Sequence, residues 1–101
     1  MTLHLKGTWR AKVRVFGIDL WSKSGKVDQS IRMTGLTEYR LPVGPVVLSI
    51  TRGPTGTDLN VDAFLGPVKI GSKLIRSGIK DTPFVANWRG GEVRLTATVA
   101  T

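Results

Sequence analysis

Few side chains in this chain are suited to catalysis. His4 is the only histidine, and it lies in a row of basic residues beside Lys6, where positive charge would crowd a general base. No motif supplies the nucleophile and the carboxylate that a serine–histidine–acid triad requires. The seven acidic residues are dispersed, without a spacing that identifies paired catalytic carboxylates. The sequence therefore predicts a protein that is not an enzyme.

Metal and cofactor sites are not predicted either. Residues 58–62, DLNVD, begin like a calcium loop, with oxygen-bearing side chains at the first, third and fifth positions. Such a loop needs glycine at its sixth position and glutamate at its twelfth, where this chain has Ala63 and Lys69. Residues 53–56 lack the lysine and the following helix of a phosphate-binding loop. The chain has no cysteine, which excludes disulfides and thiolate zinc sites.

A row of basic side chains near the N-terminus is the best candidate for a binding surface. Residues 3–15 alternate between apolar and polar side chains, as in a β-strand with one buried face and one exposed face. The exposed row holds Lys6, Arg10, Lys12 and Arg14. The whole chain has 15 Lys and Arg against 7 Asp and Glu, a formal net charge of +8. Such a positive field favours an acidic protein surface, nucleic acid or anionic lipid as the partner.

Two tryptophans near expected turns, Trp21 and Trp88, join the candidate contact residues. Aromatic side chains at such places either pack in the core or anchor a contact with a protein, and both interpretations stay open. Binding of single-stranded nucleic acid needs aromatic platforms among the cations. Trp9 falls on the apolar row, away from Arg10, and Phe64 has acidic neighbours. Nucleic-acid binding is therefore the alternative and not the first interpretation.

The elements that carry these residues are expected to be short β-strands. Alternation recurs at residues 27–34, 59–65 and 93–99, and a β-branched run covers residues 46–51. Clusters of Gly, Pro, Ser and Asp separate the strands. Among the less regular segments, residues 22–26 are expected to form a hairpin loop, residues 52–58 another loop, and residues 72–79 a strand in preference to a helical turn.

Seven or eight short strands without a convincing helix predict a single all-β domain over residues 1–101. The expected architecture is an antiparallel β-sandwich, with a small β-barrel as the alternative. Residues 39–51, YRLPVGPVVLSIT, resemble a step of transthyretin-like and Cna-B-like sandwich modules, in which a proline–glycine turn sends the chain back into a core strand. This resemblance favours the sandwich.

The combined features favour a structural or interaction module that works as a subunit of a larger assembly. The expected setting is a viral or phage virion, as a capsid-surface, decoration or tail component. Its partners would be protein subunits with an acidic surface, in a homo- or hetero-oligomer. The expected contact residues are Lys6, Arg10, Lys12, Arg14, Trp21 and Trp88.

Two other functions remain as alternatives. One is a nucleic-acid-binding β domain that uses the basic N-terminal strand, and the other is a small β-barrel that holds an apolar ligand. The sequence shows neither a signal peptide nor a run of about 20 apolar residues that could span a membrane. Synthesis in the cytoplasm, followed by incorporation into a virion, is consistent with both observations.

Overall fold

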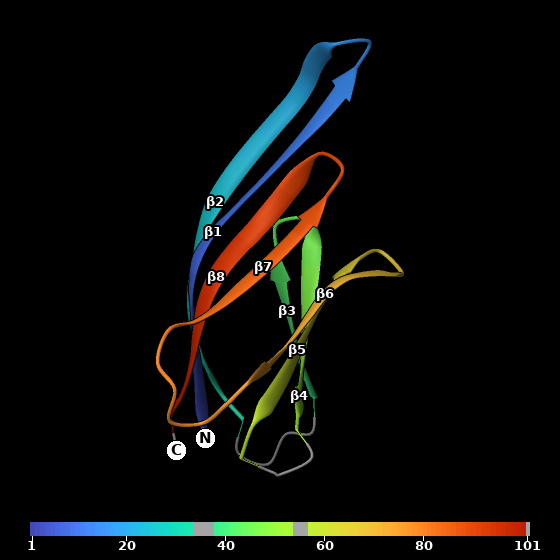
Figure 1. The fold of residues 1–101 in the computed structure, drawn as a ribbon. Helices are drawn as coiled ribbons and strands as arrows, with labels where there is room; N and C mark the ends of the chain where they lie inside the picture. The colour runs from blue at the N-terminus through green and yellow to red at the C-terminus, as the bar shows by residue number, and fades with distance from the viewer. Residues whose placement is uncertain (34–37, 54–56, 101) are drawn as a thin grey trace.

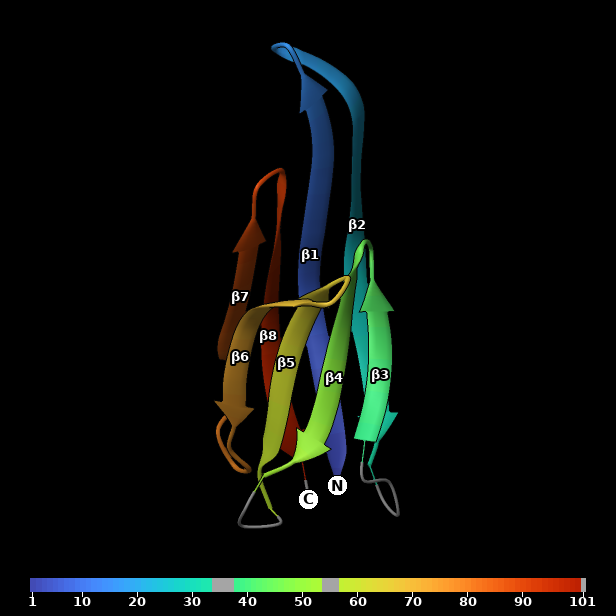
Figure 2. The same ribbon diagram turned by 90° about the vertical axis from the view of Figure 1, so that its right-hand side faces the viewer.

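A computed structural model describes residues 1–33, 38–53 and 57–100 of the chain. These residues form two four-stranded antiparallel sheets, with strand orders β2-β1-β8-β7 and β3-β4-β5-β6 (Figure 1, Figure 2). No helix in this part of the chain could cross a membrane. The strands are β1 (Thr2–Val15), β2 (Ile18–Arg32), β3 (Glu38–Val43), β4 (Val46–Arg52), β5 (Leu59–Leu65), β6 (Val68–Ile75), β7 (Thr82–Trp88) and β8 (Gly91–Ala100).

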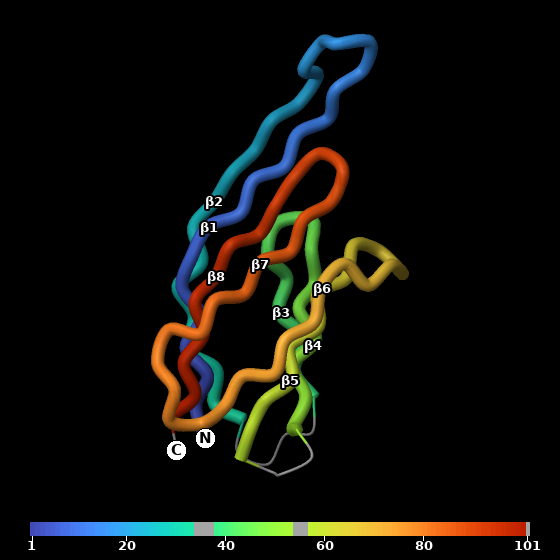
Figure 3. Tube along the Cα trace, in the orientation of Figure 1, coloured from blue at the N-terminus to red at the C-terminus, as the bar shows by residue number. Residues whose placement is uncertain are grey.

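The two sheets pack face to face, so the predicted β-sandwich is confirmed. The barrel alternative is wrong, because no hydrogen-bonded strand pair in the described residues joins one sheet to the other. The chain passes between the sheets from β2 to β3 and again from β6 to β7. The second crossing lies at the end of the sandwich that holds both termini (Figure 3). The terminal strands β1 and β8 pair with each other in the middle of the first sheet.

The core consists of the alternate residues that the sequence pattern predicts. Along β8 every second side chain is buried and its neighbours face outward, because successive side chains of a strand point to opposite faces. The buried residues of β8 and β5 are Val93, Leu95, Ala97, Val99, Leu59, Val61 and Ala63. In β6, residues 68–75 form one strand, which agrees with the predicted strand as far as Ile75.

The hairpin loop predicted at residues 22–26 is wrong. These residues continue β2, and the turn lies at Phe16 and Gly17. Both turn residues have positive φ, 52° and 76°, as a two-residue type I′ hairpin requires. Gly25 lies within a strand because the Trp9 indole fills the place where a side chain would project. The centre of the loop predicted at residues 52–58 and the end of the strand predicted at residues 27–34 lie outside the described residues.

The β1–β2 hairpin extends past the ends of all the other strands (Figure 1, Figure 2). Its two strands have 14 and 15 residues, whereas the strands of the second sheet have six to eight. The pairing of β1 with β8 ends at Ala11 and Gly91, so residues 12–22 form a two-stranded ribbon, here called the arm. The arm contributes to the elongated shape of the molecule, which measures 48 × 23 × 17 Å.

Candidate protein interaction surface

Trp9 packs at the end of the hydrophobic core that lies nearest the arm. Its indole packs against the hydrophobic core and lies between Gly25 of β2 and Gly44 of the β3–β4 turn. A Cβ atom on either glycine would come within 2.5 Å of the ring. The second sheet turns back at Gly44, and Ala11 is the last buried residue on the inner row of β1 before the arm.

The inner face of the arm is apolar and exposed. Val13 pairs with Trp21 and Val15 pairs with Ile18 across the hairpin, and cross-strand partners point to the same side. These four side chains continue the inner row of β1 and are called the apolar arm face. The sequence pattern placed Val13 and Val15 on the correct side of the strand, but their predicted burial is wrong: Val13 is 49% exposed and Val15 is 40% exposed.

The tip of the arm adds Phe16, which is 99% exposed. Phe16 adopts the left-handed conformation, which disfavours residues with a Cβ atom and is usually filled by Asn, Asp or Gly in this turn. Leu20 lies at a bulge where the register shifts and is also exposed. The turn therefore holds Phe16 in a strained backbone conformation with its apolar ring in solvent. Burial of the ring does not offset this strain in the isolated chain.

The four predicted basic residues of β1, Lys6, Arg10, Lys12 and Arg14, are all exposed on the opposite, outer face of the first sheet. By strand pairing, three further cations share this face, and three carboxylates interrupt it. This outer basic face consists of Lys6, Arg10, Lys12, Arg14, Lys26, Arg32 and Arg94, together with Asp19, Asp28 and Glu92.

Ion pairs within the chain neutralise part of the outer basic face. Arg10 Nη2 lies 2.8 Å from Glu92 Oε1, and Arg94 Nε lies 3.2 Å from the other oxygen of the same carboxylate. At the tip, Arg14 Nε donates a 2.8 Å hydrogen bond to Asp19 Oδ1. This hydrogen bond lowers the pKa of the Asp19 carboxyl and raises that of Arg14. The basic row is therefore less uniformly cationic than the sequence suggests. Among the described residues, Lys6, Lys12, Lys26 and Arg32 of this face form no salt bridge.

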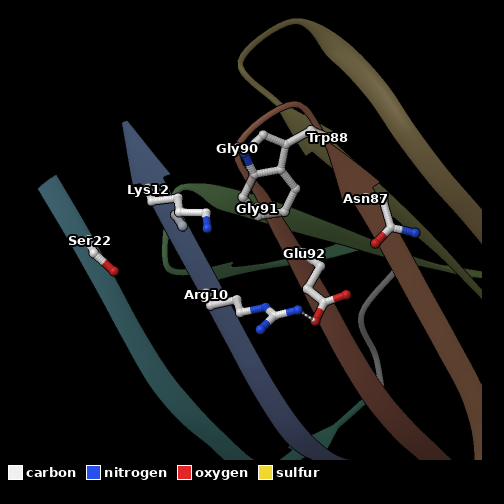
Figure 4. A pocket seen from close by; sticks show the side chains of 9 residues that line it. Arg10, Lys12, Ser22, Asn87, Trp88, Gly90, Gly91 and Glu92 are labelled. Carbon is white, nitrogen blue, oxygen red and sulfur yellow. Dashed lines mark ion pairs between the residues drawn. The ribbon is translucent and has the colours of Figure 1, made fainter. Parts of the chain in front are cut away.

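Three of the six predicted contact residues meet around one open hollow of about 420 Å³ where the arm leaves the sheet. Arg10 and Lys12 come from β1, and Trp88 comes from the end of β7 (Figure 4). Gly90 and Gly91 let the chain approach closely here, and a side chain on Gly91 would collide with the Trp88 ring. Lys6, Arg14 and Trp21 do not line this hollow.

The two predicted tryptophans have different environments. Trp88 is partly buried and packs against the core, so it supports the sandwich as well as the hollow. Trp21 is 38% exposed on the apolar arm face. The ammonium group of Lys23 lies 5.5 Å from the centroid of the Trp21 ring, within the range of a cation–π contact.

His4 meets a serine in the structure, which the sequence did not predict. Its Nδ1 lies 2.6 Å from Ser30 Oγ, and the two residues are direct cross-strand partners on the exposed outer face. No carboxylate contact orients His4 in the described residues, and His4 does not line the hollow at the base of the arm. The contact is that of an exposed polar pair in a sheet, and nothing around it resembles a catalytic triad.

The calcium-like segment does not converge on one point. Asp62 accepts a 2.6 Å hydrogen bond from Ser72 Oγ, whereas Asp58 accepts one from the backbone N–H of Ser77. Among the residues that the structure describes, no group of three His, Asp or Glu side chains could hold a metal ion.

Sequence reasoning missed the apolar residues at the end of the arm, Phe16, Ile18 and Leu20, as contact residues. The signal that could have found them is the Phe16–Gly17 pair between two alternating runs, since glycine in a two-residue linker marks a hairpin turn. Searches against family models, curated proteins and solved structures found no match to this chain.

Proposed function

We propose that this protein is a non-enzymatic structural subunit of a larger protein assembly, such as a viral or phage virion. The observation that carries the proposal is the arm, a hairpin that leaves the sandwich and exposes an apolar face with no function in the isolated fold. Six of the eleven exposed large hydrophobic side chains in the described residues lie on this short ribbon. A contiguous exposed apolar patch of this kind marks an interaction site in a soluble protein.

The outer basic face supports an acidic protein surface as a partner. Its cations lie on the side of the sheet opposite the apolar arm face, so the two surfaces can contact different neighbours at the same time. Charge complementarity of this kind mainly steers and orients association. A subunit with two separate contact surfaces can join more than one neighbour, as a component of an extended assembly must.

Nucleic acid fits the arrangement less well. The outer basic face has cations, but Trp9 and Trp21 lie on the inner side of β1 and β2. A single strand that follows Arg10 and Lys12 would therefore lack those two rings as stacking platforms. The apolar-ligand alternative loses its structural basis, because the two sheets do not close into a barrel.

Light scattering on a sizing column, at low and high salt and with absorbance recorded at two wavelengths, tests the proposal. A defined oligomer free of nucleic acid supports the assembly. A monomer that carries nucleic acid and releases it at high salt indicates the nucleic-acid alternative, because such binding depends steeply on salt. A monomer without nucleic acid at every concentration contradicts an assembly built from copies of this chain.

A further inference from the structure

We infer that the apolar arm face is covered by the same face of a second copy of this chain. The inference rests on the proposed function and names one of its contacts: two arms packed face to face, with Val13, Val15, Ile18 and Trp21 of each copy between them.

The shape of the face favours another β layer. The apolar arm face continues, in the same strands, the inner face that the second sheet covers farther down. Sheets in a sandwich pack about 10 Å apart through the side chains of their inner faces. A second arm supplies a layer of the same kind and the same length. A two-fold axis between the arms would give each copy an identical contact, which is the commonest symmetry of a homo-oligomer.

The charge distribution permits two copies of a chain with a net charge of +8 to meet in this way. Lys12 and Arg14 alternate with Val13 and Val15, so their side chains project from the opposite face of the ribbon. Face-to-face packing therefore leaves these cations in solvent. Lys23 pairs with Ala11 and therefore projects from the inner face, with its ammonium group 5.5 Å from the centroid of the Trp21 ring. The contact must leave this cation at its rim.

The same geometry argues against insertion of the arm into a lipid bilayer. Arg14 and Asp19 form an ion pair on the outer face, close to the turn at Phe16 and Gly17. Insertion of the tip would take both charges out of water, and burial of an ion pair costs more than its attraction commonly returns. A partner that covers one face only leaves this ion pair hydrated.

The exposed area is suitable for a dimer contact. The six large apolar side chains of the arm are 38% to 99% exposed, and a stable interface takes roughly 800 Å² from each partner. The arm supplies a large part of that area.

Thiol crosslinking tests which face is covered, because the chain contains no cysteine of its own. Single variants Val15→Cys and Ile18→Cys place a thiol on the apolar arm face, whereas Lys12→Cys places one on the outer face of the same ribbon. With a short bismaleimide crosslinker we expect covalent dimers from the first two variants. Lys73→Cys, on β6 of the other sheet, is the control and should give no covalent dimer, and Lys12→Cys should crosslink less than the two face variants.

A second measurement does not depend on the geometry of the crosslinker. Ile18→Thr, combined with Val13→Thr, keeps β-branched residues in the strands and removes apolar contact. This variant should weaken self-association at least tenfold in sedimentation equilibrium. Val68→Thr changes an exposed valine on β6 of the other sheet and should leave self-association unchanged.

The outcomes separate the inference from the proposed function. If the wild type is an oligomer that the arm variants do not weaken, and the face cysteines do not crosslink, the arm contact is wrong and the proposed function stands. If the wild type is a monomer at every concentration, the arm contact is wrong and so is an assembly built from copies of this chain, whereas a role as a subunit among other proteins stands. If such a monomer cosediments with anionic vesicles and Ile18→Thr abolishes this, a lipid surface covers the face and the inference is overturned.

Discussion

The indole of Trp9 occupies the space in which a side chain on Gly44 would lie, and this contact joins the two sheets where the core ends. Trp9 belongs to β1 of the first sheet, and Gly44 forms the turn between β3 and β4 of the second. The contact therefore separates the part of the β1–β2 hairpin that the second sheet covers from the arm. A substitution here should affect the sandwich and not the arm.

Gly44→Ala should destabilise the fold by about 2–4 kcal/mol. One part of this cost is the left-handed conformation at φ +59°, and the other is the collision with the Trp9 ring, which must move out of a packed core. Urea unfolding followed by tryptophan fluorescence measures the change.

Gly66→Ala is the matched control for this measurement. Gly66 has nearly the same φ, +61°, in the β5–β6 turn, and a Cβ atom there meets nothing within 4 Å. It should cost only about 1 kcal/mol, the backbone contribution. Equal losses from the two variants would show that the Trp9 contact contributes nothing to stability.

The alternation of residue types predicts the faces of the strands but not whether a face is covered. Val93 and Val13 both lie on inner rows of the first sheet, yet only Val93 is buried. The difference depends on how far the second sheet extends, which the local pattern around Val13 does not contain. Gly25 shows the same limit. Glycine is required there because the Trp9 ring on the neighbouring strand fills the space of a side chain, and the residues around Gly25 do not indicate this.

The position of the outer basic face was predictable from the alternation of residue types, but its net charge was not. The basic row of β1 lies on one exposed face, as alternation requires. Its partial neutralisation depends on Glu92, which comes from the far end of the chain and pairs with Arg10 only because β1 and β8 are neighbours. Pairing between strands distant in sequence cannot be read from the composition of either strand.

The carboxyl group of Glu38 should make stability depend on pH in the acid range. Its Oε1 accepts hydrogen bonds from Arg40 Nε at 3.1 Å and Ser49 Oγ at 3.0 Å, which lower the pKa of Glu38 below its usual 4.5. A carboxyl whose pKa is lower in the folded state stabilises the fold above the unfolded pKa, and this contribution disappears as the pH falls through the folded pKa.

A pH series of urea unfolding midpoints, for the wild type and Glu38→Gln, measures this contribution. The urea midpoint of the wild type should be higher than that of the variant above about pH 4.5. The difference between the two midpoints should shrink as the pH falls below that value. Arg40→Gln removes the first of the two hydrogen-bond donors and should flatten the pH dependence in the same direction. A difference that is constant across the series would contradict the assignment to Glu38.

Reversal of charge on the outer basic face should weaken assembly without unfolding the domain. Arg10 is unsuitable, because a glutamate in its place would lie beside Glu92. Lys12→Glu with Lys26→Glu avoids this and changes two exposed side chains of the same face. If each contributes a surface ion pair of about 0.2–1 kcal/mol to the contact, the association constant should fall severalfold.

Lys73→Glu with Lys80→Glu gives the same change in net charge away from this face, since Lys73 lies on β6 and Lys80 precedes β7. Sedimentation equilibrium at low salt compares the two double variants, and urea unfolding checks that both remain folded. Equal weakening by both would indicate a general effect of net charge, and the specific contact of the outer basic face would be wrong.

Phe16→Asn should have opposite effects on stability and on association. Asn is favoured at the first position of a type I′ turn, where φ is positive, and Phe is not. The variant should therefore stabilise the monomer by roughly 0.5–1 kcal/mol in urea unfolding at low concentration. It should also weaken self-association, because the exposed ring is lost from the arm. Phe16→Tyr retains an aromatic ring and should preserve association. A variant whose monomer is more stable but whose association constant is unchanged would show that the ring at the tip makes no contact with a neighbour. Relief of the backbone strain would then have had no effect on assembly.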